Sequence, residues 1–206
     1  MITLIAILLF SILIYFNSKF IKKHAILIYS ISTVLALLTF IFSLAFPGTV
    51  FSTLSFPWSK GFFGLALFYL VMLAGALPNW NYKKRIYSVR TELSIIGFIS
   101  ISPHAIFNLI KIFNNTIAPT YFGIITYVIM IPLFITSFII IRKKMNNRHW
   151  KNLQRFAYLA YLLLFIHLVI QFSQPINRIL YIVLFVVYSI FKIIKTVNIL
   201  KSKPKN

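Results

Sequence analysis

Residues 153–173, LQRFAYLAYLLLFIHLVIQFS, form an apolar segment of 21 residues with one charged side chain, Arg155, near its start. A helix that crosses a bilayer needs about 20 apolar residues. Such a helix pairs its own backbone N–H and C=O groups, which lipid cannot hydrogen-bond. The segment therefore predicts a transmembrane helix. His167, in its second half, is a polar group inside the membrane, and such groups are costly enough to suggest a function.

Six further segments have the length and composition of transmembrane helices, and short connections join them. Sequential helices should then be antiparallel neighbours. The sequence predicts an all-α integral membrane protein, a bundle of seven transmembrane helices. The predicted spans are 1–18, 25–46, 61–79, 92–112, 121–141, 153–173 and 179–197.

The composition supports this fold class and excludes others. Of 206 residues 60% are hydrophobic and only 11% are charged, whereas soluble domains carry about 25% charged residues. No loop is large enough for a nucleotide-binding domain, and no glycine-rich phosphate-binding motif is present. The chain has no cysteine, which excludes disulfides and thiolate ligands.

The basic residues predict the orientation. Eighteen of the 21 lysines and arginines fall on one side of the predicted bundle, and Lys60, Lys111 and Arg178 fall on the other. Cytoplasmic loops are enriched in such residues. We therefore expect a multi-pass protein of the plasma membrane with its N-terminus outside and its C-terminus in the cytoplasm. The net charge of +20 is explained by this rule, so lipid and not nucleic acid is the expected partner.

Two histidines are the candidate metal ligands. His104 lies about 18 Å and His167 about 21 Å from the inner ends of their helices, at a rise of 1.5 Å per residue. Two imidazoles at one depth on different helices are the arrangement that a six-coordinate haem needs. Gly97 and Ala160, on the same helix faces, would leave room for a flat macrocycle. Such small residues serve close helix packing equally well, and a membrane histidine can also simply hydrogen-bond a neighbouring helix.

Two motifs resemble one family. Arg90-Thr-Glu-Leu93, followed by His104, is similar to a haem-binding helix of ferric-reductase-like transmembrane proteins. Trp150-Lys-Asn-Leu-Gln-Arg-Phe-Ala-Tyr158, followed by His167, resembles a second such helix. Within the family the likeness is greatest to MsrQ/YedZ-type membrane subunits. It covers residues 25–197 as a six-helix haem core, with 1–24 as an extra helix and basic loop and 198–206 as a basic cytoplasmic tail.

The resemblance implies one b-type haem held by His104 and His167. Gln154 stands where the family has a histidine, so the second, inner haem site is expected to be absent. Either side chains fill the inner half, or a quinone, FMN or FAD inserts there, with Gln154 bonding its ring. The cations for its phosphate tail would be Arg90, Arg148, Lys151 and Arg155. The candidate partners for the haem propionates at the outer end are Lys60, Lys111 and Arg178.

The predicted function is that of a membrane electron-transfer subunit of an oxidoreductase system. Electrons would come from a cytoplasmic flavin reductase or from quinol. They would go to an outer-face reductase, ferric iron or oxygen. Two alternatives stay open: a non-haem membrane carrier or partner subunit, and a degenerate family member without haem.

Overall fold

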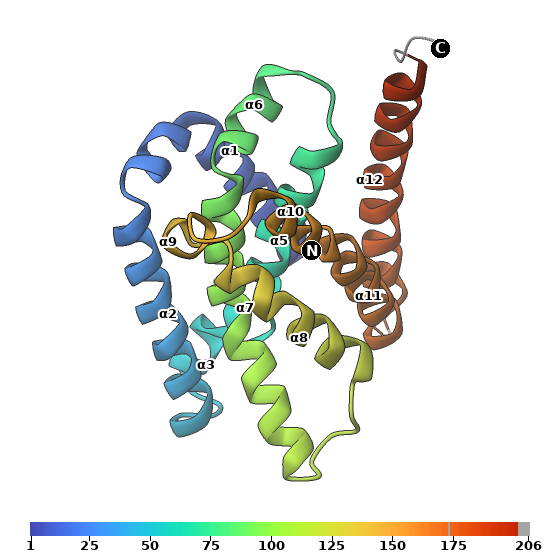
Figure 1. Cartoon of the computed structure of the whole chain (residues 1–206). Helices are drawn as coiled ribbons and strands as arrows, with labels where there is room; N and C mark the ends of the chain where they lie inside the picture. The colour runs from blue at the N-terminus through green and yellow to red at the C-terminus, as the bar shows by residue number, and fades with distance from the viewer. Residues whose placement is uncertain (173, 202–206) are drawn as a thin grey trace.

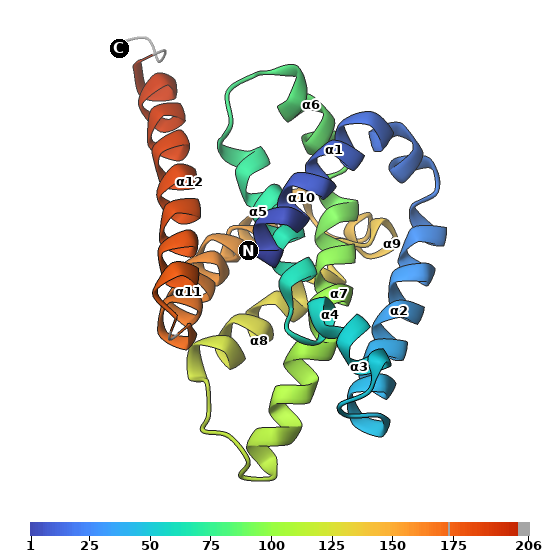
Figure 2. The ribbon, with the colours of Figure 1, turned by 180° about the vertical axis from the view of Figure 1, so that it is seen from behind.

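A computed structural model describes residues 1–172 and 174–201, and every regular element in that part of the chain is a helix (Figures 1 and 2). The helices are α1 (Ile2–Lys23), α2 (Ala25–Ala45), α3 (Val50–Leu54), α4 (Phe56–Ser59), α5 (Phe62–Ala76), α6 (Asn81–Ser88), α7 (Arg90–Phe113), α8 (Tyr121–Ile135), α9 (Ile139–Arg142), α10 (Asn147–Gln154), α11 (Phe156–Gln171) and α12 (Pro175–Lys201).

Five helical segments of the described chain are long and apolar enough to cross a membrane: α1, α2, α7, α10 with α11, and α12. The all-α membrane class is therefore supported, while seven full spans are not. The predicted spans 61–79 and 121–141 correspond to α5 and α8, which have 15 residues each. At 1.5 Å per residue such helices reach about 22 Å, less than the roughly 30 Å hydrocarbon core.

The predicted span 121–141 ends early because the backbone turns after α8. Thr136 and Ser137 donate their hydroxyl groups to the carbonyl groups of Pro132 and Leu133, and the chain then enters the single turn of α9. The span 153–173 is helical to Gln171, and Ser173 lies outside the described residues. The expected tail begins later than predicted, because α12 continues to Lys201.

Helix α5 is the centre of the bundle. Most of its side chains are buried, all round the helix, and α1, α7 and α12 pack against it. Its closest approach is to α7, where Gly64 faces Ile101. A Cβ atom on Gly64 would lie 2.7 Å from Ile101 Cβ and 2.9 Å from the Gly97 carbonyl oxygen. Glycine is thus required there for the two backbones to meet, as in many membrane helix pairs.

Helix α1 is part of this core and not an appended helix. Ala6, Ile7 and Ile14 are buried in the same cluster as the side chains of α5. Thr3 also forms a buried 2.8 Å hydrogen bond with the Tyr181 hydroxyl of α12. The N-terminal helix therefore contacts both α5 and the first part of the last helix, α12.

The basic segments do not form one level layer. The α1–α2 junction, α6 and the C-terminal end of α12 lie together at the top of Figure 1, which we call the basic end. Helices α9 and α10, which lie in another basic stretch, are nearer mid-height in both views. Because α8 is short, the chain that follows it begins at mid-height and does not reach the basic end.

Candidate functional site: a two-histidine cavity

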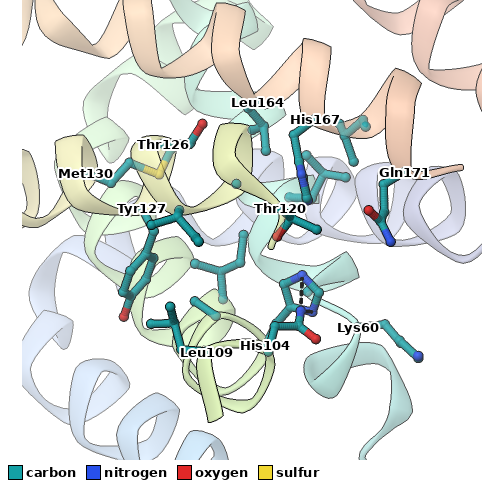
Figure 3. Close-up of a pocket in the computed structure, with 18 of the residues that line it drawn as sticks. Lys60, His104, Leu109, Thr120, Thr126, Tyr127, Met130, Leu164, His167 and Gln171 are labelled. Carbon is teal, nitrogen blue, oxygen red and sulfur yellow. Dashed lines mark hydrogen bonds between the residues drawn. The ribbon is translucent and has the colours of Figure 1, made fainter. Parts of the chain in front are cut away.

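His104 of α7 and His167 of α11 line the same cavity, of about 140 Å³, between α7, α8, α11 and the start of α5 (Figure 3). Most of the wall is apolar, with Leu65, Leu164 and Met130 among the lining residues. Polar side chains are a minority of the lining. Such a cavity, apolar with a few convergent polar groups, is the usual form of a ligand site.

Backbone and side-chain contacts fix the His104 ring. Its Nδ1 lies 3.1 Å from the Ser59 carbonyl oxygen, which can only accept, so Nδ1 carries the proton. The Asn108 amide nitrogen lies 3.2 Å from both ring nitrogens, and in this tautomer only Nε2 can accept from it. Ligating histidines commonly donate their second ring nitrogen to a carbonyl in this way. The ring is therefore oriented with the lone pair of Nε2 available for a metal once Asn108 moves aside.

A glycine lies against each ring. A Cβ atom on Gly61, at the start of α5, would come within 3.2 Å of the His104 ring carbons. A Cβ atom on Gly123 of α8 would lie 2.9 Å from Cε1 and 3.0 Å from Nδ1 of His167. Gly61 also has φ +74°, in the left-handed region that glycine adopts most easily. A residue with a Cβ atom in place of either glycine would therefore press against the neighbouring histidine ring.

Two predicted cofactor contacts lie away from the two-histidine cavity. Gly97 does not line the two-histidine cavity, since its Cα faces Leu67 and Phe68 of α5. Ala160 is fully buried but lines a second, smaller cavity. Gly97, Ile101 and His104 all face α5, which fills the space that was expected to hold a macrocycle.

Most of the other predicted contacts also lie away from the two-histidine cavity. Lys111 is half-buried, with its ammonium 4.4 Å above the Phe107 ring. Arg155 is exposed between α10 and α11. Lys60 is the cation at the cavity wall, and it extends to one side of the histidines in Figure 3.

Gln154 lines the second cavity, of about 40 Å³, and its amide donates to the Leu133 carbonyl (3.4 Å) and to the Thr136 hydroxyl (3.2 Å). Ligand sites have volumes of about 300–1,000 Å³. A flavin or quinone beside Gln154 would therefore have to displace side chains, and its presence there stays a prediction.

Aromatic rings fill the space between the two cavities. Phe98 stacks on Tyr127 with ring centroids 5.1 Å apart and on Phe134 at 4.3 Å. Phe134 then contacts Phe138 edge-on at 5.0 Å. Tyr127 lines the two-histidine cavity, while Phe98 and Phe134 line the cavity at Gln154. The region between the two cavities is therefore packed with side chains.

The sequence interpretation missed Gly61, Gly123 and the Ser59 carbonyl group. Gly123 falls among apolar residues where a glycine costs helix stability, which is the signal that could have drawn attention to it. The Ser59 carbonyl has no signal in the sequence, because a backbone acceptor is the same at every residue.

The donor set of the site suits a haem, whereas its volume is small. Among residues 1–172 and 174–201 no group of three or more His, Cys, Asp or Glu side chains gathers. The donor set is thus two imidazoles, which suits the two axial positions of a haem iron. The glycines provide a cradle. The volume of 140 Å³ is below that of typical ligand sites, so a macrocycle would require α8 to move outward.

Comparisons with known proteins give no family. No protein-family model matches the chain, and no solved structure matches it significantly. A protein of Treponema pallidum (strain Nichols), described as uncharacterized, is 28% identical over 203 residues. The match covers 87% of this chain and 56% of the Treponema protein. The chain therefore spans a little over half the length of that relative.

Proposed function

We propose that the chain is a membrane electron-transfer subunit that binds one b-type haem through His104 and His167. One observation carries the proposal. Two imidazoles from separate helices reach one apolar cavity, and each ring lies against a glycine. The resemblance of the segments that contain these histidines to ferric-reductase-like helices supports it further.

The chain's own residues have defined tasks in this proposal. Haem, when bound, supplies an iron that takes up and releases one electron. Ser59 holds the His104 ring in one tautomer through its carbonyl group. The apolar wall excludes water, and Lys60 supplies a positive charge beside the cavity for the haem carboxylates.

The donor and acceptor are separate molecules in this proposal. Electrons come from a cytoplasmic flavin reductase or from quinol. They leave to an outer-face reductase, ferric iron or oxygen. The proposal places the chain in the plasma membrane with the C-terminus in the cytoplasm, following the basic residues. A reporter active only in the cytoplasm, fused after Lys201, should be active; activity of an exported-type reporter there would reverse the orientation.

The decisive experiment is the reduced-minus-oxidised spectrum of the purified protein, expressed with a haem supply. We expect a six-coordinate low-spin signal from about one haem per chain. His104→Ala and His167→Ala should each abolish it. His24→Ala and His149→Ala are the matched controls, since both lie outside the cavity, and they should keep it. A colourless wild-type protein, or an unchanged spectrum in His167→Ala, would refute the proposal.

One observation favours a second candidate, a haem-free partner subunit. Both ring nitrogens of His104 already have partners within the chain, Ser59 and Asn108. Asn108→Ala separates the two candidates, because it frees Nε2. It should leave haem content equal or higher if His104 is a ligand, and it should destabilise the protein if the contact is structural.

A further inference from the structure

Four cations gather at the basic end of the bundle, from three different helices. Lys83 of α6, Arg90 of α7, and Lys192 and Lys195 of α12 are close enough for their charges to interact. Lys192 donates to the Tyr158 hydroxyl at 3.0 Å. Lys195 donates to the Gly75 carbonyl at 2.7 Å, at the end of α5. We call these four residues the cation cluster.

Burial distinguishes the cation cluster from the other basic residues. All four of its members are half-buried, whereas every other described lysine or arginine on the predicted cytoplasmic side is exposed. Removing a cation from water is costly unless it is paired. Lys192 and Lys195 have one oxygen partner each, and an ammonium group has three donors. The cation cluster therefore has donors left for another ligand.

The chain supplies no counter-charge for the cation cluster. Its single acidic residue is Glu92, two positions after Arg90 and so about 200° further round the helix. The charge of Glu92 acts on Tyr29 of α2, on the opposite side of α7 from α12. An anion from outside the chain is what would neutralise the cation cluster.

The surroundings match a lipid at the membrane interface. Trp80 is 52% exposed, and its ring meets Phe191 of α12 edge-on at 6.1 Å. Next to Lys192 and Lys195, Ile193 and Ile194 are exposed, and the upper part of α12 stands at the margin of the bundle in Figures 1 and 2. Basic pockets between membrane helices with such apolar margins suit anionic headgroups.

We propose that the cation cluster binds a phosphate group, that of an anionic phospholipid whose acyl chains lie along α12. Lys83, Arg90, Lys192 and Lys195 neutralise the phosphate, and Trp80 lies beside the glycerol region. The site is independent of the proposed haem function. A soluble phosphate, such as that of FMN, has the same chemistry, and the test distinguishes the two sources.

The test uses fluorescence of Trp80 in a Trp58→Phe/Trp150→Phe variant of the full chain, reconstituted in phosphatidylcholine vesicles. A minor fraction of brominated phosphatidylglycerol should quench Trp80 more than the same fraction of brominated phosphatidylcholine. Lys192→Gln and Lys195→Gln should each weaken the phosphatidylglycerol preference about fivefold, the effect of one cation near an anionic surface. Lys143→Gln and Lys144→Gln, exposed residues after α9, are the matched controls.

Three outcomes decide the proposal. Equal quenching by the two brominated lipids, or an equal loss in the Lys143 and Lys144 controls, overturns it. Displacement of brominated phosphatidylglycerol by FMN or inorganic phosphate supports the phosphate site and assigns it to a soluble ligand. Quenching that neither compound reverses supports the phospholipid.

Discussion

The two cavities along α7, α8 and α11 are neighbours with opposite packing. Met130 lines both of them. At the histidines, Gly61 and Gly123 leave the rings free of side chains opposite them. At Gln154, the rings of Phe98 and Phe134 stack and leave about 40 Å³. Space is thus left where a glycine of α8 or of the start of α5 faces a histidine ring, and it is filled where α7 and α8 present aromatic rings.

The largest expected effect comes from opening the packed region. Phe98→Ala removes the ring that Tyr127 and Phe134 stack on, and it should lower the free energy of unfolding by about 3 kcal/mol, as for other buried Phe→Ala changes. Thermal unfolding in detergent measures it. Ile106→Ala, on an exposed face of the same helix, should change little. Equal losses in the two variants would show that the stack does not stabilise the fold.

A second change tests the contact that holds α7 against α5. Gly64→Ala places a Cβ atom 2.7 Å from Ile101 Cβ, and overpacking of this kind costs about 1–3 kcal/mol. Gly75→Ala on the same helix has nothing within 4 Å of its new Cβ and should be neutral or stabilising. A Gly64→Ala variant as stable as the Gly75 control would mean that the helices separate more easily than described.

A third change fills the open region. Gly123→Ala brings a methyl group against three atoms of the His167 ring, so the ring must shift. Haem content per chain should fall severalfold, with a smaller loss of stability, about 1 kcal/mol, than in Gly64→Ala because the ring can rotate. Absorbance per protein is the measurement, with Gly75→Ala as control. Undiminished haem in Gly123→Ala would separate Gly123 from the proposed site.

The smallest effect on the haem site is expected at Gln154. Gln154→Leu removes two hydrogen bonds to α8, worth about 0.5–1.5 kcal/mol each in other proteins. The haem spectrum should be unchanged, because Gln154 lies outside the two-histidine cavity. Reduction by reduced flavin or quinol should be slower only if a donor contacts Gln154. Stopped-flow rates equal to wild type would exclude a donor at that side chain and leave only the stability loss.

The sequence predicted the helices better than their lengths. Hydropathy identifies α1, α2, α7 and α12 because their apolar runs are long and end at charged or polar residues. It gave α8 six residues too many, because residues 136–141 are mostly apolar and the backbone turn at Thr136 and Ser137 depends on hydroxyl groups that hydropathy scores only weakly.

The sequence predicted which residues of the candidate site share a helix face, but it did not predict the cavity between the helices. Periodicity places His104 with Gly97 and His167 with Ala160 on one helix face each, and the structure keeps both faces. Which neighbour each face meets depends on how the helices rotate and tilt against one another. That is why Gly97 was expected beside a cofactor although α5 covers it, and why Gly123 was missed.

The junction of α1 and α2 has a consequence for biosynthesis. The two helices are joined by His24 alone, but each packs mainly elsewhere, α1 on α5 and α6 and α2 on α7. When this hairpin leaves the ribosome, the surfaces that will hold it have not yet been translated. Domains generally fold from the N-terminus as the chain grows. Here the first two helices remain in the bilayer without their packing partners until later helices are made. A chain arrested before α5 would then expose both of them to quality-control proteases, and one arrested before α7 would still expose α2.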